Sequence, residues 1–281
     1  MTEYLLPNRA AAAGVRLAAL AELFDPWTLR RLDALGLAAG WRCWEVGAGG
    51  PSLVRAFAAR VGASGRVLAT DLDLAQIGEL DGVDHNSAEL RAAARPGKAV
   101  PFEARVHDIA RDPPPAGPFD LVHARLVLVH VPDRERALAA MASVLAPGGW
   151  LVIEDADPQL QPLACLEARG EAEELANRLR LGFRALLTAR GADLAFGRSL
   201  PRRLREAGLV EVGADAYFPV AHPALPALER ATIAMTGAQL VAAGHASEAD
   251  LARHVANLEA GHVAPTTSPM ITAWARRPAA T

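Results

Sequence analysis

The sequence predicts an α/β domain, a largely parallel sheet flanked by helices, with helical additions before and within it. Between residue 40 and about 155, short runs rich in Val, Leu and Ile alternate with Ala-, Leu- and Arg-rich helical patterns, which is typical of repeated strand–helix–strand units. After residue 157 longer helical stretches interrupt this alternation. A chain of 281 residues is long enough to bury the core of such a domain without a partner.

The strands are predicted from short apolar runs rich in β-branched residues. Five of these runs fall between residue 40 and 158, and two follow later in the chain. In order they are WRCWEVGA (41–48), GRVLATD (65–71), EARVHD (103–108), FDLVHAR (119–125), WLVIEDAD (150–157), VEVGADAYFPV (210–220) and SPMITAWARR (268–277).

The helices are predicted from apolar residues at helical spacing. One covers 133–145, with Asp133 as its N-cap and Pro147-Gly148-Gly149 as the turn that stops it. Residues 160–190 are expected to be helical throughout, and a short helix follows at 199–208. The chain is therefore divided into an N-terminal helical lid (1–39), a core (40–158), a helical cap insertion (159–196), a continuation of the core (197–221), a second cap insertion (222–263) and a final core strand (264–281).

Charge and composition exclude several classes of function. A net charge of -3 gives no basic field, so neither nucleic acid nor a membrane surface is an expected partner. Cys43 and Cys165 lack the spacing of metal ligands, and no metal site is predicted. Lys98 is the only lysine and stands outside any phosphate-binding loop motif. A cytoplasmic location is expected, because the chain lacks an apolar run of membrane-spanning length.

The stretch CWEVGAGGPSL (43–53) predicts a buried strand that enters a glycine turn and then a helix. Gly47 and Gly49 carry no Cβ, so a ligand can approach their backbone closely. Such a turn fits either a dinucleotide or S-adenosylmethionine. Pro51 removes an N–H group that a pyrophosphate would face, and Glu45 would repel a pyrophosphate but suits a ligand with an ammonium and a sulfonium. The turn therefore favours the cationic ligand.

Two further acids follow the next strands. Asp71 ends the second strand, where a carboxylate can accept hydrogen bonds from both hydroxyls of a ribose. Asp108 ends the third strand and could accept a proton from the amino group of adenine, with Leu72 and Ile109 as apolar walls for the ring. Helix N-capping is the alternative role for both acids. Asp71 supports an adenosine ligand without distinguishing the two cofactors.

EVGAGGPS, VLATDLD, VHDI, FDLVHARLVLVHVPD and LAPGGWLVIEDAD together resemble class I S-adenosylmethionine-dependent methyltransferases. The resemblance covers about residues 40–155 in consistent order and implies a Rossmann-like sheet of seven strands, the last antiparallel. It also implies S-adenosyl-L-methionine as the cofactor and a small-molecule acceptor. The sequence departs from many family members where Pro51 replaces a third glycine.

The resemblance also adds binding residues. Ala124 and Arg125, at the end of the fourth strand, are expected to border the methionine part of the cofactor. A weaker similarity of the N-terminal segment makes Tyr4 and Arg16 candidate lid contacts. The predicted cofactor-binding set is Glu45, Gly47, Ala48, Gly49, Asp71, Leu72, Asp108, Ile109, Ala124, Arg125, Tyr4 and Arg16.

A general base would help if the acceptor is a hydroxyl or a protonated amine. His130, Glu154 and Asp155 are the candidates, because each follows or closes a parallel strand at the edge where pockets form. His130 is preferred for its near-neutral ordinary pKa, although a histidine bonded to the loop backbone, or acids solvated at a strand end, would fit the same pattern. Apolar side chains of the insertions predict a mid-sized, fairly apolar acceptor, namely Leu181, Phe183, Phe196, Phe218 and Met235.

Two alternatives stay open. The chain could keep the fold and the cofactor pocket without methyl transfer, as a binding or partner subunit or as a lyase or cyclase. An NAD(P)-dependent oxidoreductase is less favoured, because Ser52 stands where a dinucleotide motif has its third glycine. The acceptor atom and the oligomeric state are not predicted.

Overall fold

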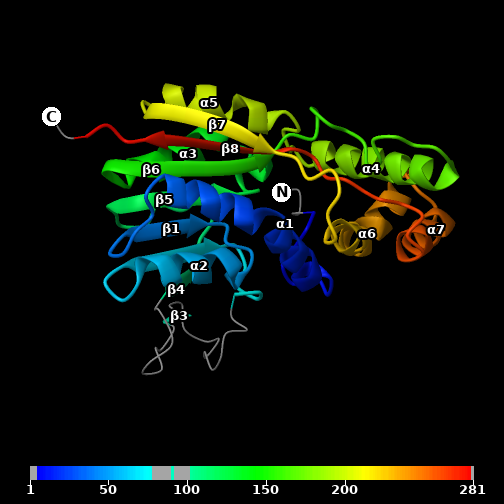
Figure 1. Ribbon diagram of the computed structural model, residues 1–281, viewed down its shortest axis with the longest axis horizontal. Coiled ribbons are helices and arrows are strands. Elements are labelled where there is room, and N and C mark those ends of the chain that lie inside the picture. The colour runs from blue at the N-terminus through cyan, green and yellow to red at the C-terminus, as the bar shows by residue number, and fades with distance from the viewer. Residues whose placement is uncertain (1–4, 78–89, 92–101, 280–281) are drawn as a thin grey trace.

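The computed structural model describes residues 5–77, 90–91 and 102–279. The predicted α/β sheet is confirmed (Figure 1), in the order β3-β4-β2-β1-β5-β6-β8-β7. Seven strands match the predicted runs, and the two-residue β3 is an addition at one edge. The strands are β1 (Arg42–Val46), β2 (Arg66–Asp71), β3 (Leu90–Arg91), β4 (Phe102–Val106), β5 (Phe119–Arg125), β6 (Leu145–Ala156), β7 (Val210–Tyr217) and β8 (Met270–Arg276).

The sheet is parallel from β4 to β6, and β8 runs antiparallel between β6 and β7. Strand β1 lies between β2 and β5, so the strand order reverses beside it. In open α/β sheets, the carboxyl ends of the strands at such a reversal form a crevice in which ligands bind. The topology therefore places a site where β1, β2 and β5 end.

Helices cover both faces of the sheet, and a separate helical group lies beyond one end of it (Figure 1). That group contains α4, α6 and α7, and α1 reaches from it to the sheet. Asp133 caps α3 as predicted, because its side chain accepts a hydrogen bond from the N–H of Arg136. The helices are α1 (Ala13–Ala34), α2 (Pro51–Val61), the 3-10 turn η1 (Leu128–His130), α3 (Arg134–Ser143), α4 (Glu171–Ala189), α5 (Phe196–Glu206), α6 (Leu225–Ala242) and α7 (Glu248–Glu259).

The expectation of a helix through all of 160–190 is wrong for its first part, since α4 begins only at Glu171. The Asn177 side chain accepts hydrogen bonds from the backbone N–H groups of Ala164 and Cys165, each at 2.8 Å, and holds that segment as a loop. A side chain can compete in this way with helical backbone bonding. No described helix is long and apolar enough to span a bilayer.

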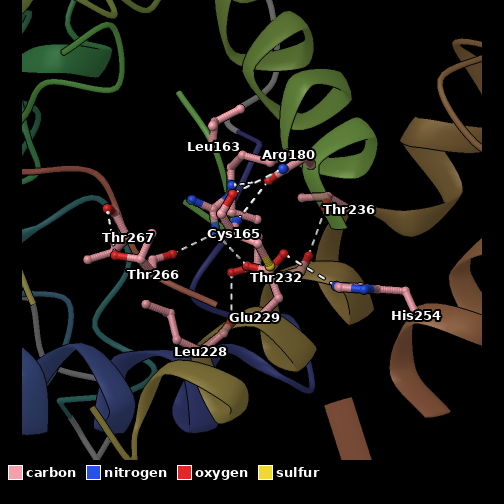
Figure 2. A network of polar contacts seen from close by, with 12 residues as sticks. Leu163, Cys165, Arg180, Leu228, Glu229, Thr232, Thr236, His254, Thr266 and Thr267 are labelled. Carbon is pink, nitrogen blue, oxygen red and sulfur yellow. Dashed lines mark hydrogen bonds and ion pairs between the residues drawn. The ribbon is translucent and has the colours of Figure 1, made fainter. Parts of the chain in front are cut away.

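Buried charges connect α4, α6 and α7 (Figure 2). Arg180 of α4 donates to Glu229 of α6 at 2.8 Å and to the carbonyl of Thr266 at 3.1 Å. His254 of α7 lies 3.4 Å from the other oxygen of Glu229. The side chain of His254 is completely buried. Asp250 completes a capping box at the start of α7.

Candidate functional site

A cavity of about 1350 Å³ opens at the carboxyl ends of β1, β2 and β5. Its wall is formed by the turn after β1, the segments after β2, β4 and β5, the first turns of α1 and the end of α4. Most of the predicted site residues meet there, although they lie far apart in the sequence. The predicted residues that line it are Arg16, Glu45, Gly47, Ala48, Gly49, Asp71, Leu72, Asp108, Ile109, Arg125 and His130.

The glycine turn has the conformation that its sequence suggests. Gly47 and Gly49 have φ angles of +63° and +64°, which residues with a Cβ rarely adopt. A Cβ on Gly47 would also lie only 2.4 Å from Cγ2 of Val127. Pro51 is the first residue of α2, as expected for a proline at a helix start. Packing against Val127 thus requires glycine at position 47, and Gly47, Ala48 and Gly49 all line the cavity.

Asp71 connects the turn to two other segments. Its carboxylate accepts hydrogen bonds from the N–H of Gly49 at 2.8 Å and the N–H of Asp73 at 3.1 Å. It also accepts one from the side chain of Asn8 at 3.1 Å, a cavity residue that sequence reasoning missed. Burial raises the pKa of Asp71, while the N–H groups of Asp73 and Gly49 oppose that shift. The acid is therefore fixed at the cavity wall in a set orientation.

Asp108 closes a turn at another part of the wall. Its carboxylate accepts a hydrogen bond from the N–H of Ala110 at 2.9 Å and lies 3.5 Å from Nε of Arg111. Asp108 thus stabilises a turn and caps no helix, because no described helix begins between β4 and β5, and it lines the cavity. Of the two residues predicted as apolar walls for adenine, Ile109 is buried, whereas Leu72 is largely exposed to solvent.

A buried row of charged side chains runs behind the glycine turn. Nδ1 of His123 lies 2.6 Å from Oε2 of Glu45, and Nε2 of His123 lies 3.3 Å from Oε2 of Glu154. Glu45 reaches the cavity, but His123 and Glu154 lie behind it and do not line it. His123 was not predicted, because in FDLVHAR it resembles any other inward-facing residue of a buried strand.

Arg125 connects the end of β5 to α1 through polar contacts. Its guanidinium lies 2.7 Å from Oδ1 of Asp25 and donates to Oγ1 of Thr28 at 3.1 Å. Ser52, at the start of α2, donates to the same aspartate. Ala124 is buried within the sheet and does not line the cavity. Tyr4 lies outside the described residues.

His130 lines the cavity and is the only catalytic candidate that does so among the three predicted residues, all of which the structure describes. Burial, together with the charges of Arg16 and Arg134, lowers the pKa of His130 to about 4. The imidazole is therefore neutral near pH 7, and it is a weaker base than an ordinary histidine.

Glu154 and Asp155 are not solvated at a strand end, because β8 and the rest of the fold bury both completely. Burial raises the pKa of Asp155 well above its ordinary value, against smaller opposing effects of the Val129 and Leu128 backbone. The predicted apolar acceptor wall also differs. Leu187 and Ala192 reach the cavity, and the five residues that were expected there do not, namely Leu181, Phe183, Phe196, Phe218 and Met235.

Comparison with known proteins identifies a shared domain. A family model described as a methyltransferase domain matches residues 16–212. The chain is 42% identical over 65 residues to methyltransferase str2 of Strobilurus tenacellus, covering 22% of this chain and 24% of that protein. It is 31% identical over 134 residues to a ubiquinone biosynthesis O-methyltransferase of Marinobacter nauticus, covering 46% and 50%. These matches span half or less of the curated relatives.

Solved structures share the fold at low sequence identity. A protein from an antibiotic biosynthesis pathway of Anabaena variabilis aligns with a TM-score of 0.57 at 15% identity, covering 89% of this chain and 96% of that one. Phosphoethanolamine N-methyltransferase 2 of Haemonchus contortus, in complex with S-adenosyl-L-methionine, aligns with a TM-score of 0.53 at 15% identity, covering 90% and 52%. At such identities the likeness establishes the fold alone.

Proposed function

The chain belongs to the methyltransferase-domain family, and from that membership we propose that it transfers the methyl group of S-adenosyl-L-methionine to an oxygen, nitrogen or carbon atom of a small molecule. One observation carries the proposal. The open glycine turn, the fixed carboxylate of Asp71 and the acid Glu45 face the same cavity. The turn offers backbone groups, Asp71 offers an acceptor for hydroxyl groups, and Glu45 offers a negative charge. An adenosine ligand with a positively charged group needs all three.

The described residues fit this cofactor. Gly47 and Gly49 line the cavity and carry no side chain, so the methionine part can approach the backbone of the turn. Asp71 can accept hydrogen bonds from ribose hydroxyls, and Asp108 with Ile109 offers an acceptor and an apolar wall for adenine. The resemblance to the family supports the same assignment.

When bound, S-adenosylmethionine supplies a methyl group on a sulfonium, an electrophile that requires no protein nucleophile. The chain's own contribution is then orientation of the acceptor and exclusion of water, which can lower a barrier by roughly 7–11 kcal/mol when the geometry is good. Neutral His130 can accept a proton from a hydroxyl acceptor, although its lowered pKa makes it a weak base. Positioning is therefore the main catalytic effect that we propose.

The volume of the cavity and the apolar side chains on its wall support a mid-sized, fairly apolar acceptor. Ligand pockets commonly measure about 300–1,000 Å³, and this cavity of about 1350 Å³ has room for a second ligand beside the cofactor. Leu17 and Leu20 of α1 and Leu187 of α4 contribute apolar surface. We propose that α1 and the first helical insertion, which contains α4, act as a cap over both ligands, whereas no described residue of the second insertion lines the cavity.

Calorimetry tests the cofactor assignment directly. Wild-type protein should bind S-adenosylmethionine but neither NAD nor NADP. Asp71→Ala should weaken that binding by at least about ten-fold, whereas Asp33→Ala, which removes an acid paired with Arg60 at the surface, should not. Unchanged affinity in Asp71→Ala would contradict the site.

Transfer of a labelled methyl group tests the reaction. Purified protein is incubated with methyl-labelled S-adenosylmethionine and a panel of phenols, amines and activated carbon acids, and label in the acceptor is counted. We expect transfer to one acceptor class. Binding of the cofactor without transfer to any acceptor would instead favour the alternative of a non-catalytic binding subunit or a lyase or cyclase.

A further inference from the structure

The buried row behind the glycine turn has two ends with different surroundings. Its inner end is Glu154, which is held by Thr272 of β8 at 2.6 Å and by a hydrogen bond from Thr28 of α1. Its outer end is Glu45, which lines the cavity. His123 lies between the two carboxylates and is completely buried. One imidazole therefore connects the cavity wall with the lid helix and the antiparallel strand.

The charges around His123 decide its protonation. Burial alone would lower the pKa of His123, but the charge of Glu45 and the hydrogen bonds to Glu154 and Glu45 raise it to about 9. Both ring nitrogens face a carboxylate oxygen, which is the arrangement of a doubly protonated ring. The ring of Phe57 from α2 packs against His123 with centroids 5.6 Å apart, and Arg125, two residues further along β5, is paired with Asp25.

The sum of these charges is negative. Glu45, Glu154 and Asp25 supply three carboxylates, whereas His123 and Arg125 supply two cations. Glu45 is the member of the set that lines the cavity. Burial raises the pKa of Glu45, and the charge and the hydrogen bond of His123 are the largest effects that oppose this shift. A buried negative charge favours a cationic partner strongly, because little water competes with it.

We infer that His123 is a positioning residue, which holds Glu45 ionised and aimed into the cavity, so that Glu45 binds the ammonium group of the cofactor's methionine part. This inference rests on the proposed function. His123 does not touch the ligand, and its effect should be confined to ligands that carry the ammonium group. Asp71 and Asp108, which face the adenosine part, should bind equally well without it.

Two ligands separate this role from a structural one. S-adenosylhomocysteine carries the ammonium group, and 5′-methylthioadenosine keeps the adenosine but lacks the amino-acid part. In calorimetry, His123→Gln should weaken binding of S-adenosylhomocysteine by about ten-fold or more and change binding of 5′-methylthioadenosine by less than about two-fold. Equal weakening of both ligands, or of neither, would overturn the inference.

Val122→Ala is the matched control. Val122 is the preceding residue of β5, is fully buried and lies outside the charged row, so its truncation reports general loosening of the strand. We expect Val122→Ala to change the affinities for the two ligands by similar factors. If wild-type protein binds neither ligand, the proposed function itself fails. If it binds both and His123→Gln shows no selectivity, only the role of His123 fails.

A measurement on wild-type protein keeps the inference testable if His123→Gln does not fold. The chain has eight histidines. In nitrogen-15 NMR spectra at pH 8, one imidazole should still carry protons on both nitrogens, and its signals should shift when S-adenosylhomocysteine binds but not when 5′-methylthioadenosine binds. Absence of a doubly protonated ring, or an equal response to both ligands, would overturn the inference.

Discussion

The conformation of Gly47 makes this position the most sensitive in the turn. Gly47→Ala would place a residue with a Cβ at positive φ, which costs roughly 1–2 kcal/mol, and would force Val127 to move. Gly62→Ala is the control, because Gly62 has φ +64° and no atom near the new Cβ. Thermal unfolding should show a larger loss for Gly47→Ala, and calorimetry should show lost cofactor binding in that variant alone. Equal effects of the two substitutions would contradict a ligand cradle at Gly47.

The lowered pKa of His130 predicts a pH dependence of stability. The unfolded chain takes up this proton near pH 6.5, whereas the folded protein does so only near its pKa of about 4. The free energy of unfolding therefore falls as pH drops from 6.5 toward 4. His130→Gln should flatten this dependence in urea titrations at several pH values. Curves that stay parallel to wild type would contradict the burial of a neutral His130.

The ion pair of Arg180 and Glu229 predicts that the cap is stabilised by buried charge. Glu229→Gln or Arg180→Met should destabilise the protein by roughly 3–5 kcal/mol, because each leaves a buried charge without its partner. Arg202→Ala is the control, since its pair with Glu206 is exposed on α5 and is worth about 0.5 kcal/mol at most. Urea unfolding measures both. Similar losses in all variants would contradict the prediction.

Glu229 also predicts how the cap responds to acid. Burial would raise its pKa, but Arg180 and then His254 lower it to about 2. A carboxylate with a lowered folded pKa stabilises the protein above its ordinary pKa of 4.5, and that contribution is lost as pH falls from there toward 2. Hydrogen exchange in α6 and α7 should accelerate in this range for wild type, and to a lesser degree for Glu229→Gln. Acceleration of the same size in both would contradict the role of Glu229.

Elements that form their own local pattern could be predicted from the sequence. Strand runs such as FDLVHAR are apolar enough to be recognised alone, and Asp133 caps its helix through bonds within four residues. The start of α4 could not be predicted, because it depends on Asn177 reaching back to the loop at Ala164 and Cys165. The composition of that segment favours a helix, but the tertiary hydrogen bonds to Asn177 override this preference.

The same distinction holds for the site. Gly47, Asp71 and His130 follow strands whose order fixes where they meet, so topology alone brought them to one cavity. Asn8 could not be predicted, since it reaches Asp71 across 63 residues of sequence. Glu154 lies near the end of β6, but α1 and β8 contact it and it is buried. Burial of a residue by segments that lie far away in the sequence cannot be predicted from the local sequence pattern.

At the scale of the whole molecule, cofactor binding should protect the cap as well as the core. With S-adenosylhomocysteine at one hundred times its dissociation constant, linkage predicts about 2.7 kcal/mol of added stability. Hydrogen exchange should slow in the first turns of α1, in residues 130–133 and at the end of α4, which line the cavity, and not in α5, which does not. Protection limited to the turn after β1 would contradict a cap made by α1 and α4.

The position of β8 in the sheet has a consequence for synthesis of the protein. β8 is synthesised after β6 and β7 but lies between them in the sheet. In the described sheet, β7 pairs with β8. While the ribosome adds residues 218–269, nascent β6 and β7 therefore keep open edges, which are prone to pair with other chains. Only when β8 has emerged can it join the two strands, so the described sheet is completed after residues 270–276 have been made.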